Sequence, residues 1–201
     1  WRILFVLFTA RIGLGFQFQT MGSVSNDLVY AFGLDYTEIG TLVGLFLLPG
    51  MFLAIPAGLG GRYFSDRLLV GLGLVALALG GLASGWASDP WLVGVGRAVS
   101  GVGFVLSSLY FTKMVADWFS GREIATAMGI LVMSWPFGIA AGQIGHEWIA
   151  VTAGWRWTFI AASAYCLAAA IAVFIFYEPP LDTAKSGKGT VSGLSGHEWY
   201  L

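Results

Sequence analysis

The sequence predicts an all-α integral membrane protein, a bundle of six transmembrane helices, from its composition and from the spacing of its apolar stretches. Of its 201 residues, 57% are hydrophobic and 10% are charged, whereas a soluble domain usually carries about 25% charged residues. Even a large soluble domain buries only about 75% of the surface that its unfolded chain exposes. A chain this apolar therefore needs lipid around it.

Six apolar stretches have roughly the 20-residue length that crosses a hydrocarbon core. They cover residues 3–26, 38–60, 68–87, 91–116, 124–146 and 155–177. The breaks between them are short and rich in turn residues, at 33–35, 65–67, 88–90, 120–122 and 153–154. Connections this short force neighbouring helices to run antiparallel.

Individual residues in three of these stretches allow further structural predictions. The first contains Arg11, is too long for a secretory signal and has no small-residue cleavage site, so we expect it to remain in the mature protein. In the fifth, Pro136 should kink the helix and free a backbone carbonyl. The sixth contains the sole cysteine, Cys166, which can form no intrachain disulfide and is expected to be a small buried hydrophobe.

The distribution of charge orients the bundle. One side of the predicted bundle collects most of the cations: Arg2, Arg62, Arg67, Arg122, Lys185 and Lys188. The other side has a single cation beside five acids: Arg156 with Asp27, Asp35, Glu38, Asp89 and Glu147. By the positive-inside rule, we expect both ends of the chain on the cytoplasmic side of an inner membrane of the bacterial type.

The composition changes abruptly near residue 180. Residues 181–196 are polar and rich in Gly, Ser and Lys, as in a flexible linker, and residues 197–201 (HEWYL) turn amphipathic and aromatic. We therefore expect a six-helix bundle over 1–180, a cytoplasmic linker over 181–196, and the start of a seventh helix over 197–201.

The six stretches also repeat in groups of three. Arg11 and Gly15 in the first stretch match Arg97 and Gly101 in the fourth, and a proline stands in both the second and the fifth stretch. An odd number of helices per repeat inverts the orientation in the membrane, so we expect two inverted three-helix repeats.

Local motifs carry a resemblance to a known family. They are GRAVSGVG at 96–103, DWF at 117–119, GRE at 121–123, AMG at 127–129 and GWRWTF at 154–159. With these motifs the chain resembles the major facilitator superfamily over essentially its whole length. The resemblance implies a transporter of twelve helices in two six-helix halves, with alternating access to a central site. This chain would be the N-terminal half and would need a C-terminal six-helix half as its partner.

The family's cytoplasmic signature, Gly-x3-Asp-Arg-x-Gly-Arg, is altered in residues 56–67. Arg62 matches the signature arginine, but Gly61 replaces the aspartate and Phe64 replaces the second glycine. The nearest acid is Asp66, followed by Arg67. The resemblance implies a gating role for Arg62, Asp66 and Arg67, and the displaced acid puts the family's latch in question.

Polar residues within the apolar stretches are costly in lipid and are functional candidates. Arg11, Gln19 and Asn26 lie near one face of the first stretch, and Arg97 opens the fourth. We interpret them as substrate-binding residues, with a structural ion pair as the alternative for the two arginines. Because every acid lies at or near a helix end, the substrate is expected to be a small organic or inorganic anion, which Arg can bind through two hydrogen bonds.

Three titratable residues could couple transport to protons: Asp27, His146 and Glu147. The alternative is that they lie at the membrane interface. Residues 134–138 (SWPFG) resemble a fifth-helix motif of drug/proton antiporters, with Trp135 in place of the glycine before the proline. A drug/proton antiporter is therefore an alternative to an anion transporter, as is a channel or a non-transporting receptor.

Other classes of function are excluded by composition. The net charge is −1 and the ten Lys and Arg are scattered, so no nucleic-acid partner is indicated. An intramembrane hydrolase needs a nucleophile and a base at membrane depth, but the two histidines are His146 and His197, and His197 follows the polar tail. We expect no enzyme activity, no cofactor and no metal site.

Overall fold

The computed structural model describes residues 1–119, 121 and 123–180, and within them every regular element is a helix. The helices are α1 (Arg2–Ser23), α2 (Ser25–Phe32), α3 (Tyr36–Leu47), α4 (Pro49–Gly60), α5 (Asp66–Gly85), α6 (Pro90–Trp118), α7 (Glu123–Ala153) and α8 (Trp155–Phe176). Six spans are long and apolar enough to cross a membrane, with α3 and α4 together forming the second. The predicted fold class is confirmed.

Two boundaries differ by three residues or more from those predicted. The first span ends at Ser23 rather than at 26, and a short helix, α2, follows after Val24. Residues 23–27 hold Ser, Asn and Asp, whose side chains compete with the helix for backbone hydrogen bonds. The fifth span continues past 146 to Ala153, because residues 147–153 contain no Gly or Pro, and it ends before Gly154, whose φ is 97°.

The predicted turns contain the residues that start the next helices. Asp35 and Glu38 form a reciprocal capping box, in which the Asp35 carboxylate accepts from the Glu38 N–H at 2.7 Å. Ser65 accepts from the Leu68 N–H at 3.4 Å, and Asp89 accepts from the Leu92 N–H at 2.9 Å. Each side chain satisfies a backbone donor that the first helical turn leaves free.

Glycines allow the helices to approach closely. A Cβ on Gly15 of α1 would meet the carbonyl oxygen of Trp135 on α7, and one on Gly101 of α6 would meet the carbonyl oxygen of Phe46 on α3. The first helix of each predicted repeat therefore packs against the second helix of the other. Small residues at helix contacts are typical of membrane bundles, where close packing replaces the hydrophobic effect.

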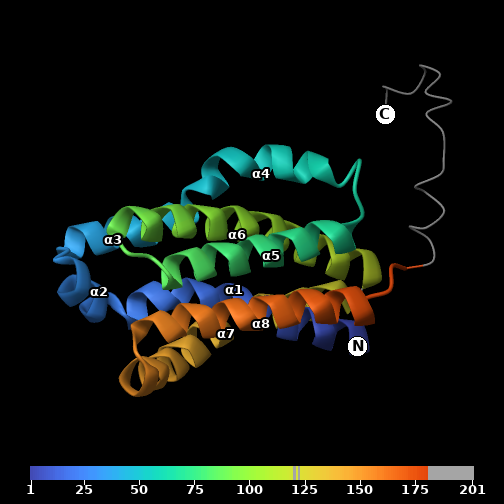
Figure 1. Cartoon of the computed structure of the whole chain (residues 1–201). Coiled ribbons are helices and arrows are strands. Elements are labelled where there is room, and N and C mark those ends of the chain that lie inside the picture. Colours follow the sequence, from blue (N-terminus) through green and yellow to red (C-terminus); the bar gives the residue numbers. More distant parts are fainter. Residues whose placement is uncertain (120, 122, 181–201) are drawn as a thin grey trace.

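The helix ends sort into two groups (Figure 1). Trp1, the 61–65 turn and the C-terminal end of α8 lie at one end of the bundle, which we call the N-terminal end. The links between α2 and α3, α5 and α6, and α7 and α8 lie at the other end. Arg2, Arg62 and Arg67 share the N-terminal end, in agreement with the predicted alternation. Arg122, Lys185, Lys188, the 181–196 linker and the 197–201 segment lie outside the described residues.

Candidate functional site

Arg11 bridges α1 and α7. Its Nη1 donates to the carbonyl oxygen of Leu131 at 2.8 Å and to the hydroxyl of Ser134 at 3.1 Å. The Ser134 hydroxyl in turn donates to the same Leu131 carbonyl at 2.6 Å. The buried Nε of Arg11 has no partner among the described residues. The guanidinium is thus oriented by neutral acceptors, and no described carboxylate neutralises it.

Arg97 is held differently. It is 1% exposed, and its Nη1 donates to the Gln17 carbonyl at 3.2 Å and to the Thr20 hydroxyl at 3.3 Å. Its Nη2 donates to the Phe18 carbonyl at 3.3 Å, and the guanidinium lies 4.4 Å from the centre of the Phe46 ring. Arg97 therefore joins α6 to the backbone of α1 and to α3, and no acid within the described chain pairs with it.

The other predicted substrate contacts lie farther along the chain, Gln19 in α1 and Asn26 in α2. Gln19 donates to the side chain of Gln143 on α7 at 2.5 Å and to Ser23 at 3.5 Å. Asn26, exposed in α2, accepts from the Tyr36 hydroxyl at 3.2 Å. Gln19 is eight residues from Arg11, or about 12 Å along a helix. The structure thus separates these amides from Arg11. It adds Gln143 to the polar residues of the site, and Gln143 could have been found from the sequence as a polar residue within an apolar span.

The three candidates for proton coupling are in different surroundings. Asp27 and Glu147 are exposed. His146 is fully buried, its ring centre lies 4.2 Å from that of Phe16 on α1, and neither ring nitrogen has a hydrogen-bond partner in the described chain. His146 continues the stripe of Ser134, Gly138 and Gly142 that faces α1, which is why the structure buries it.

Four aromatic side chains from four spans meet within the bundle. Phe18 of α1 lies 5.4 Å from Phe46 of α3 and 5.3 Å from Trp135 of α7, measured between ring centres. Phe104 of α6 lies 5.4 Å from Phe46 and 5.0 Å from Trp135. We call these four residues the aromatic box. Phe46 is fully buried, whereas Phe18, Phe104 and Trp135 are half-buried.

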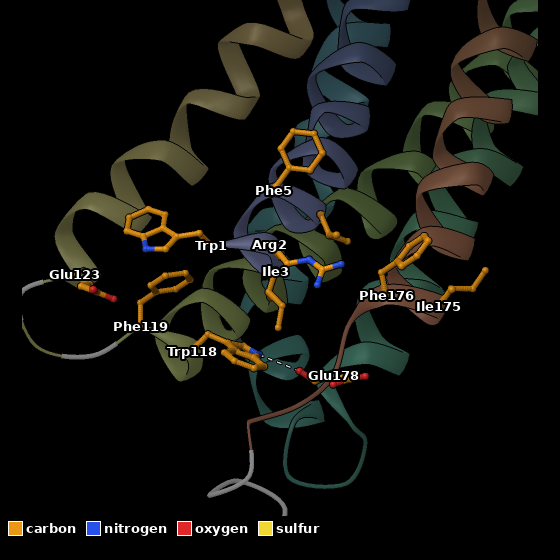
Figure 2. A pocket seen from close by; sticks show the side chains of 11 residues that line it. Trp1, Arg2, Ile3, Phe5, Trp118, Phe119, Glu123, Ile175, Phe176 and Glu178 are labelled. Carbon is orange, nitrogen blue, oxygen red and sulfur yellow. Dashed lines mark hydrogen bonds between the residues drawn. The ribbon is translucent and has the colours of Figure 1, made fainter.

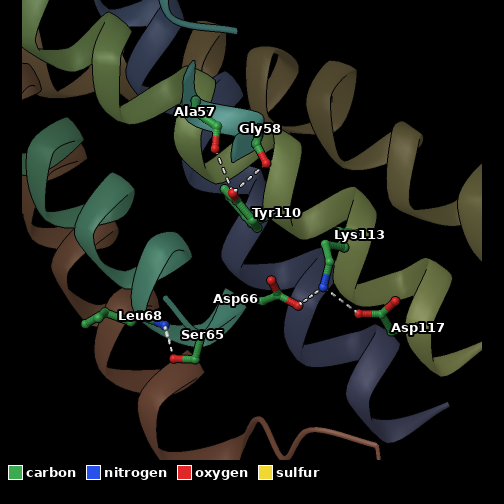
Figure 3. A network of polar contacts seen from close by, with 8 residues as sticks. All are labelled: Ala57, Gly58, Ser65, Asp66, Leu68, Tyr110, Lys113 and Asp117. Atoms are coloured by element: carbon green, nitrogen blue, oxygen red, sulfur yellow. Dashed lines mark hydrogen bonds and ion pairs between the residues drawn. The ribbon is translucent and has the colours of Figure 1, made fainter. Parts of the chain in front are cut away.

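The altered cytoplasmic signature has a structural counterpart at the N-terminal end (Figure 3). Lys113 of α6 pairs with Asp66 of α5 and, at 3.0 Å, with Asp117. Arg62 is exposed, and Arg67 lies 5.4 Å from the centre of the Phe174 ring. Of the three predicted gating residues, only Asp66 therefore joins this charged cluster.

Tyr110, one turn before Lys113, contacts the end of α4. Its hydroxyl donates to the carbonyl oxygens of Ala57 at 2.6 Å and Gly58 at 3.4 Å (Figure 3). A Cβ on Gly61 would lie 3.0 Å from the Tyr110 ring, so the glycine that replaces the signature aspartate makes room for this tyrosine. Sequence reasoning did not find Tyr110. Nearby, burial and the charges of Asp66 and Asp117 raise the pKa of Tyr177 to about 12.

A cavity of about 890 Å³ opens at the N-terminal end, between α1, α6, α7, the last turn of α8 and the residues after it (Figure 2). Its lining includes Arg2, Glu123 and Glu178, and Trp118 donates to the Glu178 carbonyl at 3.0 Å. Neither Arg11 nor Arg97 lines it. In the part of the chain that the structure describes, no group of three His, Cys, Asp or Glu side chains could hold a metal ion.

Comparisons with known proteins give the family. The profile of the Major Facilitator Superfamily matches residues 3–197. A probable sphingolipid transporter, spinster homolog 1 of Arabidopsis thaliana, is 30% identical over 83% of this chain and 33% of that protein. A quinolone resistance transporter of Acinetobacter baumannii is 27% identical over 90% of this chain and 41% of that protein.

Solved structures share the fold. The proton:xylose symporter XylE, bound to 6-bromo-6-deoxy-D-glucose, superposes with a TM-score of 0.79 at 16% identity, over 88% of this chain and 44% of XylE. The chain spans less than half the length of the proteins it matches here. Because the profile covers nearly the whole chain, the chain belongs to the Major Facilitator Superfamily, a family of membrane transporters and not of enzymes.

Proposed function

We propose that this chain is the N-terminal half of a secondary transporter that moves a small anion across the inner membrane by alternating access. The observation that carries the proposal is the half-buried guanidinium of Arg11, which lies within a membrane span with no carboxylate beside it among the described residues. An unpaired charge in this position is expensive. A substrate anion would neutralise it.

The hydrogen bonds of Arg11 suit this role. Leu131 and Ser134 engage Nη1, which fixes the plane of the guanidinium, while no described residue accepts a hydrogen bond from Nη2. Arginine binds carboxylates and phosphates through two parallel hydrogen bonds and keeps its charge at any working pH. Because Gln19 and Asn26 lie away from Arg11, we propose them as donors farther along the solute pathway and not to the same bound anion. Arg97, whose guanidinium is engaged by the α1 backbone, would contribute positive charge from behind the site.

The proposal is tested by uptake into liposomes containing the full-length protein, with phosphate, gluconate and benzoate compared with uncharged glucose and benzamide. Arg11→Lys and Arg11→Gln should each weaken uptake of the transported anion. Losing one charged hydrogen bond costs about 1.5–3 kcal/mol, or roughly 10- to 150-fold in affinity. Arg156→Lys is the control, because Arg156 contacts the Ala87 carbonyl at the opposite end of the bundle. Wild-type affinity and rate in both Arg11 variants would make Arg11 structural.

A drug/proton antiporter of the same superfamily is the second candidate. It is favoured by the SWPFG motif on α7 and by the similarity to a quinolone resistance transporter. The charge of the solute separates the two candidates. A drug/proton antiporter expels an uncharged or cationic drug when protons enter, whereas the anion transporter carries anions only. A channel or a receptor concentrates no solute against its gradient.

We propose His146, rather than Asp27 or Glu147, as the residue that carries a coupled proton. It is the buried one of the three, and an imidazole can take up and release a proton. The α1 side chains against it are Phe16 and Gln19, which do not titrate, and Tyr165 of α8 lies behind Phe16. His146→Gln should remove the pH dependence of uptake, and Glu147→Gln should keep it. The reverse pattern would assign the proton to Glu147.

A further inference from the structure

We infer that the substrate is an organic anion with a flat apolar body, whose charge lies at Arg11 and whose body lies on the aromatic box of Phe18, Phe46, Phe104 and Trp135. This inference rests on the proposed function and adds the class of substrate to it. It starts from the position of the box relative to the two arginines.

The box is built from equivalent positions of the two repeats. Phe18 follows Arg11 by seven residues, and Phe104 follows Arg97 by seven residues. The other two rings, Phe46 and Trp135, belong to the second span of each repeat. Gly101 packs against the backbone carbonyl of Phe46, and Gly15 packs against that of Trp135. The box therefore lies at the interface between the repeats, the region where inverted-repeat transporters place their substrates.

Arg11 is within reach of the same ligand. Seven residues are two helical turns, so Phe18 lies on the same face of α1 as Arg11, about 10 Å farther along. Trp135 directly follows Ser134, the side chain to which Arg11 donates. A carboxylate at Arg11 thus has the first ring of the box about 10 Å farther along the helix, a separation that a fused-ring acid spans.

The surfaces of the box suit an apolar ring. Phe18, Phe104 and Trp135 are half-buried, so each keeps part of its ring uncovered. Phe46 closes the box from behind and is itself backed by the Arg97 guanidinium at 4.4 Å. Aromatic side chains favour other aromatic or apolar rings in stacked or edge-on contact. A hydrated inorganic anion would gain nothing from these surfaces.

Trp135 also has an explanation in this arrangement. It stands where the resembling antiporter motif has a glycine, next to Pro136. In the structure its indole completes the box by contacting both Phe18 and Phe104. The alternative occupant of the box is a side chain from the other six-helix half, and the experiment includes that outcome.

The test measures binding to the purified full-length protein in nanodiscs with three probes: 2-naphthoate, its uncharged analogue 2-naphthamide, and inorganic phosphate. The naphthoate should bind at least about tenfold more tightly than either of the others. Trp135→Leu should weaken naphthoate binding about tenfold and leave phosphate unchanged. Phe104→Leu is a second variant with the same expectation, in case Trp135→Leu does not fold. Trp148→Leu is the control, because Trp148 lies on the same helix and is 70% exposed.

The outcomes separate this inference from the proposed function. If phosphate binds as tightly as naphthoate and its binding depends on Arg11, the role of the box is overturned, but an anion transporter is supported. Naphthamide that binds as tightly as naphthoate overturns the anion assignment, and with it the inference. Absence of binding by all three probes overturns the inference and assigns the box to packing against the second half.

Discussion

The two arginines within the membrane spans differ in what satisfies them. Arg97 is buried, and its side chain engages two carbonyls, a hydroxyl and an aromatic ring. Arg11 is half-buried and has two neutral acceptors on one nitrogen. Sequence reasoning treated both as candidates for substrate contact, because a sequence shows whether acids are near but not which backbone carbonyls a helix crossing will expose.

This difference predicts opposite effects of the matched substitutions Arg97→Gln and Arg11→Gln. Arg97→Gln removes the hydrogen bonds of a buried guanidinium and its contact with the Phe46 ring, and a hydrogen bond to a charged group contributes about 1.5–3 kcal/mol. The full-length variant should therefore melt at a lower temperature. Arg11→Gln should change the melting temperature less and solute affinity more. Equal loss of melting temperature in both variants would contradict the assignment.

At the scale of helices, α6 contacts the segments on both sides of the 61–65 turn through Tyr110 and Lys113, and Asp117 pairs with Lys113. Tyr110 binds the last turn of α4, and Lys113 binds Asp66 at the start of α5 (Figure 3). Pro49 begins α4 after a break in the second span, and α4 packs mainly against α6. The Tyr110 hydroxyl is thus the polar contact that ties the end of this short helix to the rest of the bundle.

Hydrogen exchange should resolve the two contacts. Tyr110→Phe removes the hydroxyl but keeps the ring, so backbone exchange in residues 56–64 should become faster while residues 69–80 keep the wild-type rate. Lys113→Met should speed exchange at the start of α5 and leave 56–60 unchanged. If each variant instead showed faster exchange in both segments, the turn would move as one unit.

The helices themselves were largely predictable, because lipid imposes length and hydropathy on every span. The turns at 33–35 and 88–90 were also predicted, and in the structure Asp35 and Asp89 within them cap the helices that follow. The burial of His146 was not predicted. His146 and Glu147 are polar and mark the predicted end of the fifth stretch, whereas the helix continues to Ala153. The aromatic box was not predicted either, because it joins four spans whose rotations about their axes depend on glycine contacts.

For the whole molecule, the orientation in the membrane is a prediction from charge. The N-terminal end carries Arg2, Arg62 and Arg67, so it should face the cytoplasm. Phe64 is 55% exposed at this end and Tyr36 is 70% exposed at the other. In intact cells, an impermeant thiol reagent should label Tyr36→Cys and not Phe64→Cys. The native Cys166 is buried and should add no signal. Labelling of Phe64→Cys from outside would invert the orientation.

This half alone is not expected to transport a solute. The second and fifth spans are the least covered, with 22% of their most apolar windows buried, against 61% for the third. The fifth also exposes Gln143, a polar side chain that is unfavourable against lipid. These spans are therefore expected to contact the C-terminal half, which would supply the other wall of the solute pathway.

Purified residues 1–201 in liposomes should show no saturable uptake of a solute that the full-length protein transports. Co-expression with the remaining half should restore uptake, and the same pair with Arg11→Gln should not. Specific, saturable uptake by residues 1–201 alone would show that one half encloses a complete pathway.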